Sequence, residues 1–231
     1  MPGERLVRIL ALLSAGGTTD PGTRRLCDVC AEVFVASGAG VMLMSDDVPR
    51  GAVCTTDDVS ALIEELQYTL GEGPCVDAHN QGRPVLEPDL ADPETPRWFA
   101  FTPPALHAGA RAVFGFPMHV GAVRLGAVNV YRDRPGPLSA DQHADGLVMA
   151  DVAAHTVLAM QAAAAPGTVS AELELGANFH LVVHQASGMV AAQLDSTMAE
   201  GLIRLRAHAF ANDLTLTDVA EAVVARRLRF E

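Results

Sequence analysis

Four cysteines carry the most reactive side chains of this chain. Cys27 and Cys30 lie about one helical turn apart, whereas Cys54 and Cys75 stand alone. A four-thiolate zinc site usually comes as two close pairs of cysteines, so this spacing matches it poorly. We therefore expect buried or half-buried reduced thiols, with no metal site and no catalytic cysteine.

Two pairs of adjacent carboxylates, Asp57-Asp58 and Glu64-Glu65, are further groups with acid–base potential. Adjacent residues on a helix point in different directions, so neither pair is expected to share a proton. We expect both pairs to lie at solvated helix starts and faces. The sequence also has no Gly-x-Ser-x-Gly elbow and no His-Glu-x-x-His motif. It therefore predicts no catalytic residue.

Five residues near the middle of the chain are candidates for lining a small-molecule pocket: Cys75, Trp98, Phe101, Phe114 and Phe116. Cys75 follows Gly-Pro in an expected loop, and Phe114 and Phe116 point to the same face of an expected strand. Aromatic residues at strand alternation are also typical of a plain hydrophobic core. The sequence leaves both interpretations open.

Arginines near the C-terminus form two groups. Arg204 and Arg206 lie in one expected helix beside His208, and Arg226–Arg229 end the next helix. The helix dipole explains cations at a helix C-terminus, at about 0.3–1 kcal/mol each, and this covers the second group. It does not cover Arg204, which lies in the middle of its helix. Guanidinium groups suit paired phosphate contacts and stacking on bases, so Arg204 indicates a local nucleic-acid site.

Composition limits the remaining possibilities. The 231 residues include 28 acidic residues against 16 cations, all of them arginine, for a net charge of -12. This charge excludes sequence-independent nucleic-acid binding by the whole chain. Apolar residues make up 49% of the chain, which is enough for a core and excludes a largely disordered protein. No apolar run reaches the roughly 20 residues that cross a bilayer, so we expect a soluble, cytoplasmic protein without membrane contact.

The first two thirds of the chain alternate helix and strand signals. Expected strands cover Val41–Met44, Ala52–Thr55, Pro84–Leu86, Ala112–Met118 and Leu125–Tyr131. The last two are separated by a short turn, which predicts an antiparallel hairpin. Expected helices cover Leu6–Leu13, Asp20–Ser37, Ser60–Leu70 and Asp141–Ala163.

Leucine spacing assigns a buried face to two of these helices. In Ser60–Leu70 it is the stripe of Leu62, Leu66 and Leu70. In the long helix it is the face that carries Leu147, Ala150, Ala154 and Leu158.

Beyond an expected hinge at Ala162–Gly167, the pattern is helical. The three helices are expected over about Ser170–Gln193, from Ser196 to Asn212-Asp213, and onward from Thr217 as N-cap. Thr197 and Glu200 fit a capping box at the start of the second helix. The sequence thus predicts an α+β chain of two domains. Residues 1–165 hold a mixed sheet, and residues 166–231 hold a three-helix unit.

Three stretches of the C-terminal part, His184–Val190, Ala199–Ala209 and Leu216–Val223, resemble the ANTAR domain. That family is a three-helix RNA-binding module of bacterial transcription antitermination regulators. The resemblance implies RNA contacts in this region, with candidates Ser187, Gly188, Arg204, Arg206, His208, Arg226 and Arg227. The family commonly has Lys in place of Ser187 and Ala in place of Gly201, and a mid-helix Gly costs ~0.5–1 kcal/mol relative to Ala.

The N-terminal part resembles a GAF domain of the kind fused to ANTAR in actinobacteria. The stretches that carry this resemblance are Gly71–Ala78, Pro84–Leu90, Arg111–Pro117 and Leu125–Tyr131. The resemblance implies an antiparallel sheet flanked by helices that senses a small ligand or signal. None of the residues of a cyclic-nucleotide motif is recognisable, so no cofactor is expected and the ligand stays unidentified.

Together these features predict a cytoplasmic regulator that binds stem-loops of a nascent transcript and acts by antitermination. We expect a homodimer through the Asp141–Ala163 helix or the first C-terminal helix, because paired RNA loops need two binding units. Two alternatives remain. One is a GAF-fold methionine sulfoxide reductase that uses thiols such as Cys54 or Cys75. The other is a protein-interaction module that binds no RNA.

Overall fold

The computed structural model describes residues 2–15, 22–45, 48–92, 94, 97–162, 181–212 and 214–231. The chain divides into two compact units, Met1–Asn178 and Phe179–Glu231. The predicted boundary after residue 165, and the hinge beyond Ala162, lie outside the described residues and stay predictions.

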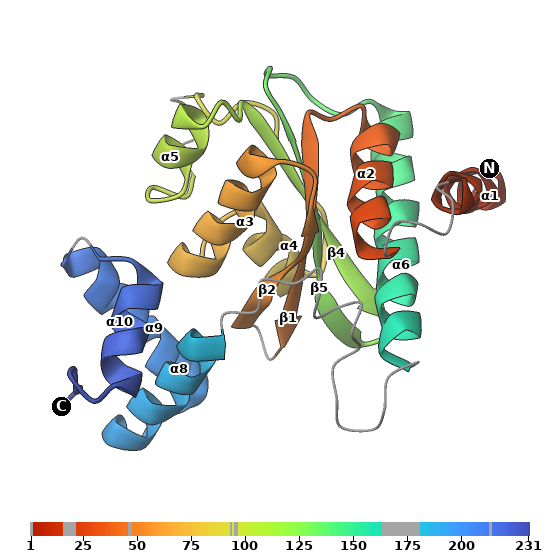
Figure 1. Cartoon of the computed structure of the whole chain (residues 1–231). Coiled ribbons are helices and arrows are strands. Elements are labelled where there is room, and N and C mark those ends of the chain that lie inside the picture. Colours follow the sequence, from red (N-terminus) through yellow and green to blue (C-terminus); the bar gives the residue numbers. More distant parts are fainter. Residues whose placement is uncertain are drawn as a thin grey trace. The chain divides into compact units, whose positions relative to one another are not determined.

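The first unit is built on an antiparallel sheet. Its described strands are β1 (Gly38–Ser45), β2 (Val48–Thr55), β3 (Val85–Glu87), β4 (Ala112–Val120) and β5 (Val123–Arg132). They lie in the order β2-β1-β5-β4-β3, and each neighbouring pair is antiparallel. β4 and β5 form the predicted hairpin (Figure 1).

Helices cover both faces of this sheet (Figure 1). Helices α2 (Gly22–Phe34) and α6 (Ala140–Ala162) pack on one face, and α3 (Asp58–Leu70) and α4 (Pro74–Gln81) pack on the other. Helix α1 (Pro2–Ser14) packs against α6, and the short α5 (Thr102–His107) packs against α3. None of the described helices combines the length and the apolar character needed to cross a membrane.

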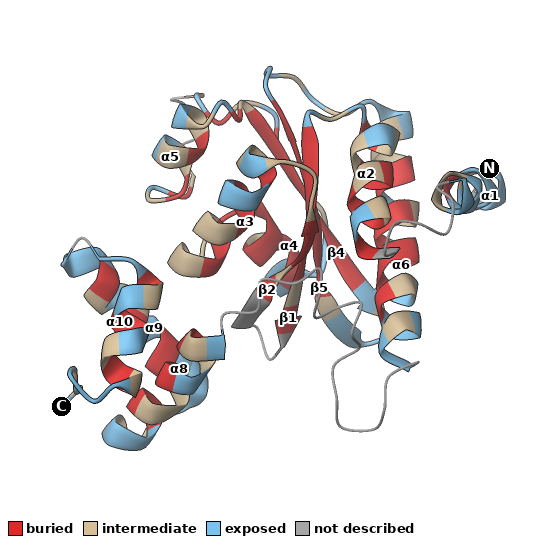
Figure 2. Ribbon diagram, in the orientation of Figure 1, coloured by how far each residue is buried: buried red, intermediate tan, exposed pale blue. Residues whose placement is uncertain are grey.

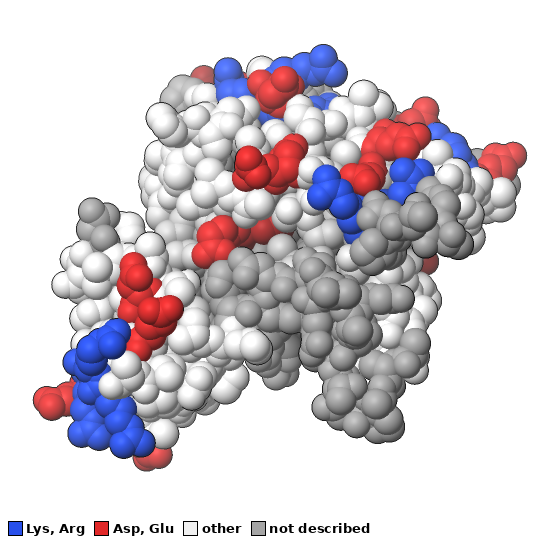
Figure 3. All heavy atoms as spheres, in the orientation of Figure 1, with Lys and Arg blue, Asp and Glu red and all other residues white. Residues whose placement is uncertain are grey.

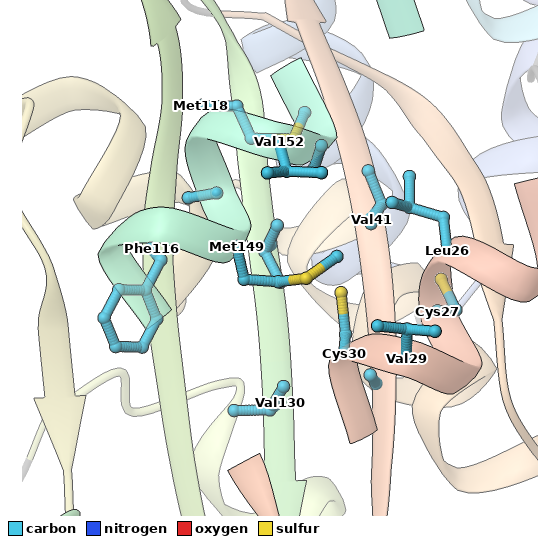
Figure 4. Close-up of a cluster of buried hydrophobic side chains, with 14 of the residues drawn as sticks. Leu26, Cys27, Val29, Cys30, Val41, Phe116, Met118, Val130, Met149 and Val152 are labelled. Atoms are coloured by element: carbon cyan, nitrogen blue, oxygen red, sulfur yellow. The ribbon is translucent and has the colours of Figure 1, made fainter. Parts of the chain in front are cut away.

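Strand alternation divides the buried side chains of this unit into two cores, and Figure 2 shows how strongly they concentrate on the sheet. The core on the α2–α6 face includes Phe34, Val41, Phe114, Phe116, Val130 and Met149, several of which appear in Figure 4. The core on the opposite face includes Ile63, Trp98, Phe101, Val113 and Tyr131. The sheet therefore separates side chains that are close in sequence.

The buried faces of α3 and α6 differ from the leucine stripes expected above. On α3, Leu62 is 39% exposed, whereas its neighbour Ile63 is fully buried. On α6, Leu147 and Leu158 of the expected face are exposed, whereas its Ala150 and Ala154 are buried together with Met149. Alanine and glycine let a helix approach the sheet closely. Close packing of small residues, and not the positions of the leucines, therefore decides which face of the helix is buried.

The described part of the second unit consists of α8 (Leu181–Leu194), α9 (Met198–Ala211) and α10 (Leu216–Val224). The predicted start of the first of these helices, Ser170, lies outside the described residues. The capping box is confirmed, because Thr197 Oγ1 accepts from Glu200 N and Glu200 Oε2 accepts from Thr197 N. The predicted N-cap Thr217 is wrong: Thr215 caps α10 and accepts from Asp218 N at 3.0 Å.

Helices α8 and α9 approach each other most closely at Gly201. A Cβ on Gly201 would collide with the carbonyl oxygen of Ser187 and lie 3.1 Å from the backbone nitrogen of Ala191. Glycine at position 201 is therefore required for the contact between α8 and α9. The sequence predicts that a mid-helix glycine weakens α9, and the close packing of the two helices offsets this cost.

Candidate functional site

A buried polar cluster lies between the sheet and helices α3 and α4. We call it the Glu64 cluster; its members are Glu64, Gln67, Cys75 and Asn129, and each is at most 2% exposed. Buried polar groups normally have hydrogen-bond partners. Here both carboxylate oxygens of Glu64, Nε2 of Gln67 and Oδ1 of Asn129 have none among the described residues. This shortage marks the cluster as a candidate ligand site.

Two glycines make room for the Glu64 cluster on the sheet. Asn129 of β5 pairs with Gly40 of β1 on one side and Gly115 of β4 on the other, which gives a row across three strands. A Cβ on Gly40 would lie 2.5 Å from Oε1 of Glu64, and a Cβ on Gly115 would collide with the backbone carbonyl of Pro74. Helices α3 and α4 therefore contact the sheet backbone directly at this row.

The electrostatics of Glu64 are those of an acid removed from water. Burial raises the pKa of its carboxyl group from 4.5 to about 8, and the nearby side-chain amide of Asn129 opposes this rise only in part. No described cation contributes to this shift. Glu64 is therefore protonated in much of the population near neutral pH.

Gln67 connects this acid to the start of α4. Its Oε1 accepts a hydrogen bond from the backbone nitrogen of Cys75 at 2.6 Å. Burial, followed by the charge of Glu64, raises the pKa of the Cys75 thiol well above its ordinary value. A thiol held in this protonated form is a poor nucleophile.

Hydrogen bonds also fix the segment that carries the single tryptophan of the chain. Oε1 of Glu72 accepts from the backbone nitrogens of Ala100 and Phe101 at 2.7 and 2.8 Å. Oδ2 of Asp77 accepts from Trp98 Nε1 at 3.1 Å. These contacts tie the segment to the loop before α4 and to α4 itself, on the same side of the sheet as the Glu64 cluster.

The second unit carries exposed arginines, and Figure 3 shows blue side chains gathered on one part of it. Arg204 on α9 is exposed, as are Arg226 and Arg227 beyond α10. Arg206 is half-buried, and so is His208, whose ring packs edge-on against Phe230 at 5.5 Å.

Two large apolar side chains lie near these arginines on the same helix. Ile203 is 59% exposed and Phe210 is 75% exposed. They are seven residues apart, so they lie on one face of α9, with Arg204 and Arg206 on its two flanks.

Ser187 does not belong to this surface. Its side chain is 2% exposed, and its hydroxyl donates to the carbonyl oxygen of Val183 at 2.7 Å. The expectation that Ser187 faces RNA is therefore corrected, because the residue serves the contact between α8 and α9. The neighbouring Gly188 is half-buried.

Comparison with protein families decides the identity of the first unit. The GAF domain family matches residues 23–165, well over half of the chain. The chain belongs to the GAF domain family. The matched residues contain α2–α6 and all five described strands, and they stop before the three-helix unit. A comparison with curated proteins gives no match.

Solved GAF domains share this fold. The GAF domain of a phosphoenolpyruvate-protein phosphotransferase from Acinetobacter is 12% identical, with 70% of this chain and 96% of that chain covered and a TM-score of 0.52. The corresponding domain from Coxiella burnetii is 14% identical, with 70% and 95% covered and a TM-score of 0.51. Free methionine-R-sulfoxide reductase from Neisseria meningitidis is 16% identical, with 71% and 92% covered and a TM-score of 0.47. The two phosphotransferase domains, at 12% and 14% identity, show the fold alone, and no conclusion is drawn from the reductase, whose TM-score is below 0.5.

The GAF domain does not unite the five predicted pocket residues. Phe114 and Phe116 lie in the α2–α6 core, whereas Trp98 and Phe101 lie in the core on the other face. Cys75 lies on that second side, near Gly115. The sheet stands between the two aromatic pairs, so the five residues do not line one pocket. A pocket lined by some of them, on the side of Trp98, Phe101 and Cys75, stays a prediction.

The cysteines of the GAF domain also differ from expectation. Cys27 of α2 and Cys54 of β2 form a disulfide, so the expectation of four reduced thiols is wrong. Cys30 and Cys75 are free and buried. Cys30 lies with Cys27 in the α2–α6 core, shown in Figure 4, and burial raises the pKa of its thiol. Among the described residues, no group of three metal-ligating side chains comes together.

Sequence reasoning did not select Glu64, Gln67 or Asn129 as site residues. Glu64 was expected in a solvated pair with Glu65, and Asn129 lies in a strand with apolar neighbours on either side. The available signal was that Gly40, Gly115 and Asn129 interrupt apolar strands. A glycine or a polar residue in a buried strand indicates a close approach by another group.

Proposed function

We propose that this chain is a signal-responsive RNA-binding regulator that acts by transcription antitermination. The GAF domain senses a small molecule at the Glu64 cluster, and the three-helix unit binds stem-loops of a nascent transcript. The observation that carries the RNA half is the exposed Arg204 beside exposed apolar groups on α9.

The surface of α9 suits RNA loops better than duplex RNA or DNA. Loops present unpaired bases that stack on aromatic side chains and guanidinium planes. Phe210 and Ile203 form an exposed apolar strip. Arg204 adds a cation in the middle of the helix, where the helix dipole does not account for it. The resemblance of this unit to ANTAR domains supports the same assignment.

The acidic net charge of -12 favours selective RNA binding. An acidic chain gains little from general attraction to phosphates, so its affinity depends on a few placed contacts. Stabilising a stem-loop through these contacts disfavours a competing terminator hairpin and permits read-through. Because two loops need two binding units, we further propose that the protein acts as a homodimer in the cytoplasm.

Catalysis by thiols is the weaker alternative. A thiol-dependent methionine sulfoxide reductase needs an accessible thiolate and a second cysteine to resolve the oxidised form. Here Cys75 is buried with a raised pKa, and Cys54 is held in a disulfide with Cys27.

A binding titration of the full chain tests the RNA assignment. The titrant is an RNA with two adjacent stem-loops, measured at two salt concentrations. Arg204→Ala should weaken binding by ~1–3 kcal/mol if the side chain reads a base; if it contacts a phosphate, the salt dependence should fall by about one unit. Arg83→Ala, at an exposed arginine of the GAF domain, is the matched control and should bind like the parent. Unchanged binding by folded Arg204→Ala would favour the protein-interaction alternative.

A further inference from the structure

Among the atoms of the Glu64 cluster that lack a hydrogen-bond partner, acceptors outnumber donors. When Glu64 is ionised, three are acceptors: Oε1 and Oε2 of Glu64 and Oδ1 of Asn129. One is a donor, Nε2 of Gln67. A molecule that satisfies this set must donate more hydrogen bonds than it accepts.

The acceptors of Glu64 and Asn129 come from different elements but meet over one point of the sheet. Glu64 reaches down from α3 until its Oε1 lies against Gly40, and Asn129 is the residue that pairs with Gly40 on β5. Their proximity also appears in the pKa of Glu64, which the nearby Asn129 side chain lowers. A single small group at this point can therefore donate hydrogen bonds to acceptors of both residues.

The charge of Glu64 limits the class of ligand further. A buried carboxylate is stable only when it is paired or protonated, and no described cation pairs with Glu64. An anionic ligand such as a carboxylate or a phosphate would add a second negative charge beside it. A divalent metal ion takes more oxygen ligands than this single carboxylate and its neighbours supply.

We propose that the Glu64 cluster binds a small cation with N–H donors, of the ammonium, amidinium or guanidinium class, an inference that rests on the sensing role proposed above. The carboxylate of Glu64 supplies the negative charge and two acceptors. Asn129 Oδ1 supplies the third acceptor, which restricts the ligand to groups with several N–H donors in one place. The ligand takes the place of the proton that Glu64 otherwise carries.

Competition with a proton makes binding depend on pH. Only ionised Glu64 attracts the cation, so the affinity should rise up to tenfold per pH unit until the pH reaches about 8, the pKa of Glu64, and then level off. Among the described residues, the Cys75 thiol of α4 interacts with the charge of Glu64, Tyr68 lies one turn further along α3, and His79 lies one turn from Cys75 on α4. β1 and β5 contribute the non-titrating Gly40 and Asn129.

Calorimetric titration of the full chain with simple salts tests this proposal. Methylammonium and guanidinium carry N–H donors, whereas tetramethylammonium has the same charge and none. The first two should bind with an affinity that rises with pH, and tetramethylammonium should not bind. Glu64→Gln, which keeps the shape of the protonated acid, should abolish binding. Glu65→Gln, on the neighbouring half-buried residue that accepts from Thr69, should bind like the parent.

Three results would overturn the inference: equal binding of tetramethylammonium, equal binding by folded Glu64→Gln, or absence of binding by both N–H cations across the pH range. The pH dependence is measured on the unaltered chain, so the test stands even if Glu64→Gln does not fold. The same samples then receive stem-loop RNA. Cation binding without any RNA binding would contradict the proposed RNA-binding function but not the proposed class of ligand. RNA binding without cation binding would contradict the proposed class of ligand but not the RNA-binding function.

Discussion

The carboxylate of Glu64 lies against Gly40, with its Oε1 2.5 Å from the point where a Cβ on the glycine would be. An acid from α3 thus occupies the space that a side chain of β1 would normally fill. The position buries the acid without a counter-charge, which is costly unless a proton or a ligand supplies one. A GAF domain that only needed a stable core would be better served by an apolar residue at this position.

Glu64 should make the stability of the first unit depend on pH. Because its pKa in the folded chain, about 8, lies above the ordinary 4.5, the folded state holds a proton that the unfolded state has lost between these values. Stability should therefore fall as the pH rises from 4.5 to 8, by at most ~1.4 kcal/mol per pH unit, and then level off. Denaturant titrations at several pH values measure this slope. Glu64→Gln should flatten it and Glu65→Gln should not; a slope that survives in Glu64→Gln would assign the effect to another group.

Gly40→Ala should destabilise the first unit by ~1–3 kcal/mol, because the new methyl group collides with Glu64. A second change that shortens the acid, Glu64→Ala, should recover part of this loss. The interaction energy from a double-mutant cycle of Gly40→Ala and Glu64→Ala measures the contact. Strictly additive losses would show that the two residues do not touch in solution.

Gly201→Ala should weaken the three-helix unit by ~1–3 kcal/mol, although alanine is the better helix former. The reason is the collision with the carbonyl of Ser187. Gly188→Ala is the matched control, since no described atom comes within 4 Å of its Cβ position outside its own helix backbone. That change should stabilise the unit by up to ~1 kcal/mol. Thermal unfolding of both variants decides the matter, and stabilisation by Gly201→Ala would mean that α8 and α9 are further apart.

The disulfide between Cys27 and Cys54 should contribute to the stability of the GAF domain. It closes a loop across 27 positions and joins α2 to β2, so its loss should cost ~2–4 kcal/mol. Alkylation of the unfolded, unreduced chain should label two cysteines, and prior reduction should raise the number to four. In Cys30→Ala, the number of cysteines labelled without reductant should fall from two to one, and the disulfide should stay intact. Labelling of all four cysteines without reductant would contradict the pairing.

The strand pattern was the most informative part of the sequence. Alternation correctly placed Phe114 and Phe116 on one face, and the short turn after Val120 correctly gave an antiparallel hairpin. Alternation could not show that Trp98 and Phe101 would lie across the sheet, since their segment is irregular and is positioned by hydrogen bonds to Glu72. Local periodicity assigns a face within a strand but not the side on which a loop packs.

The site itself was largely hidden from sequence reasoning. A carboxylate on a helix is normally solvated, so nothing local distinguished Glu64 from Glu65. The difference comes from Gly40, more than 20 positions earlier, which pairs with Asn129 far along the chain. The disulfide was hidden for a similar reason: the near neighbour of Cys27 is Cys30, but the fold brings Cys54 to it.

Crosslinking and sequencing of RNA bound to the full chain in its source cells tests the central claim most directly. The account predicts enrichment of short paired stem-loops that overlap or precede terminator hairpins, with the enrichment lost in Arg204→Ala and kept in Arg83→Ala. Recovery of no RNA above background by the parent chain, or the same RNA set from Arg204→Ala, would contradict the assignment of an RNA-binding regulator.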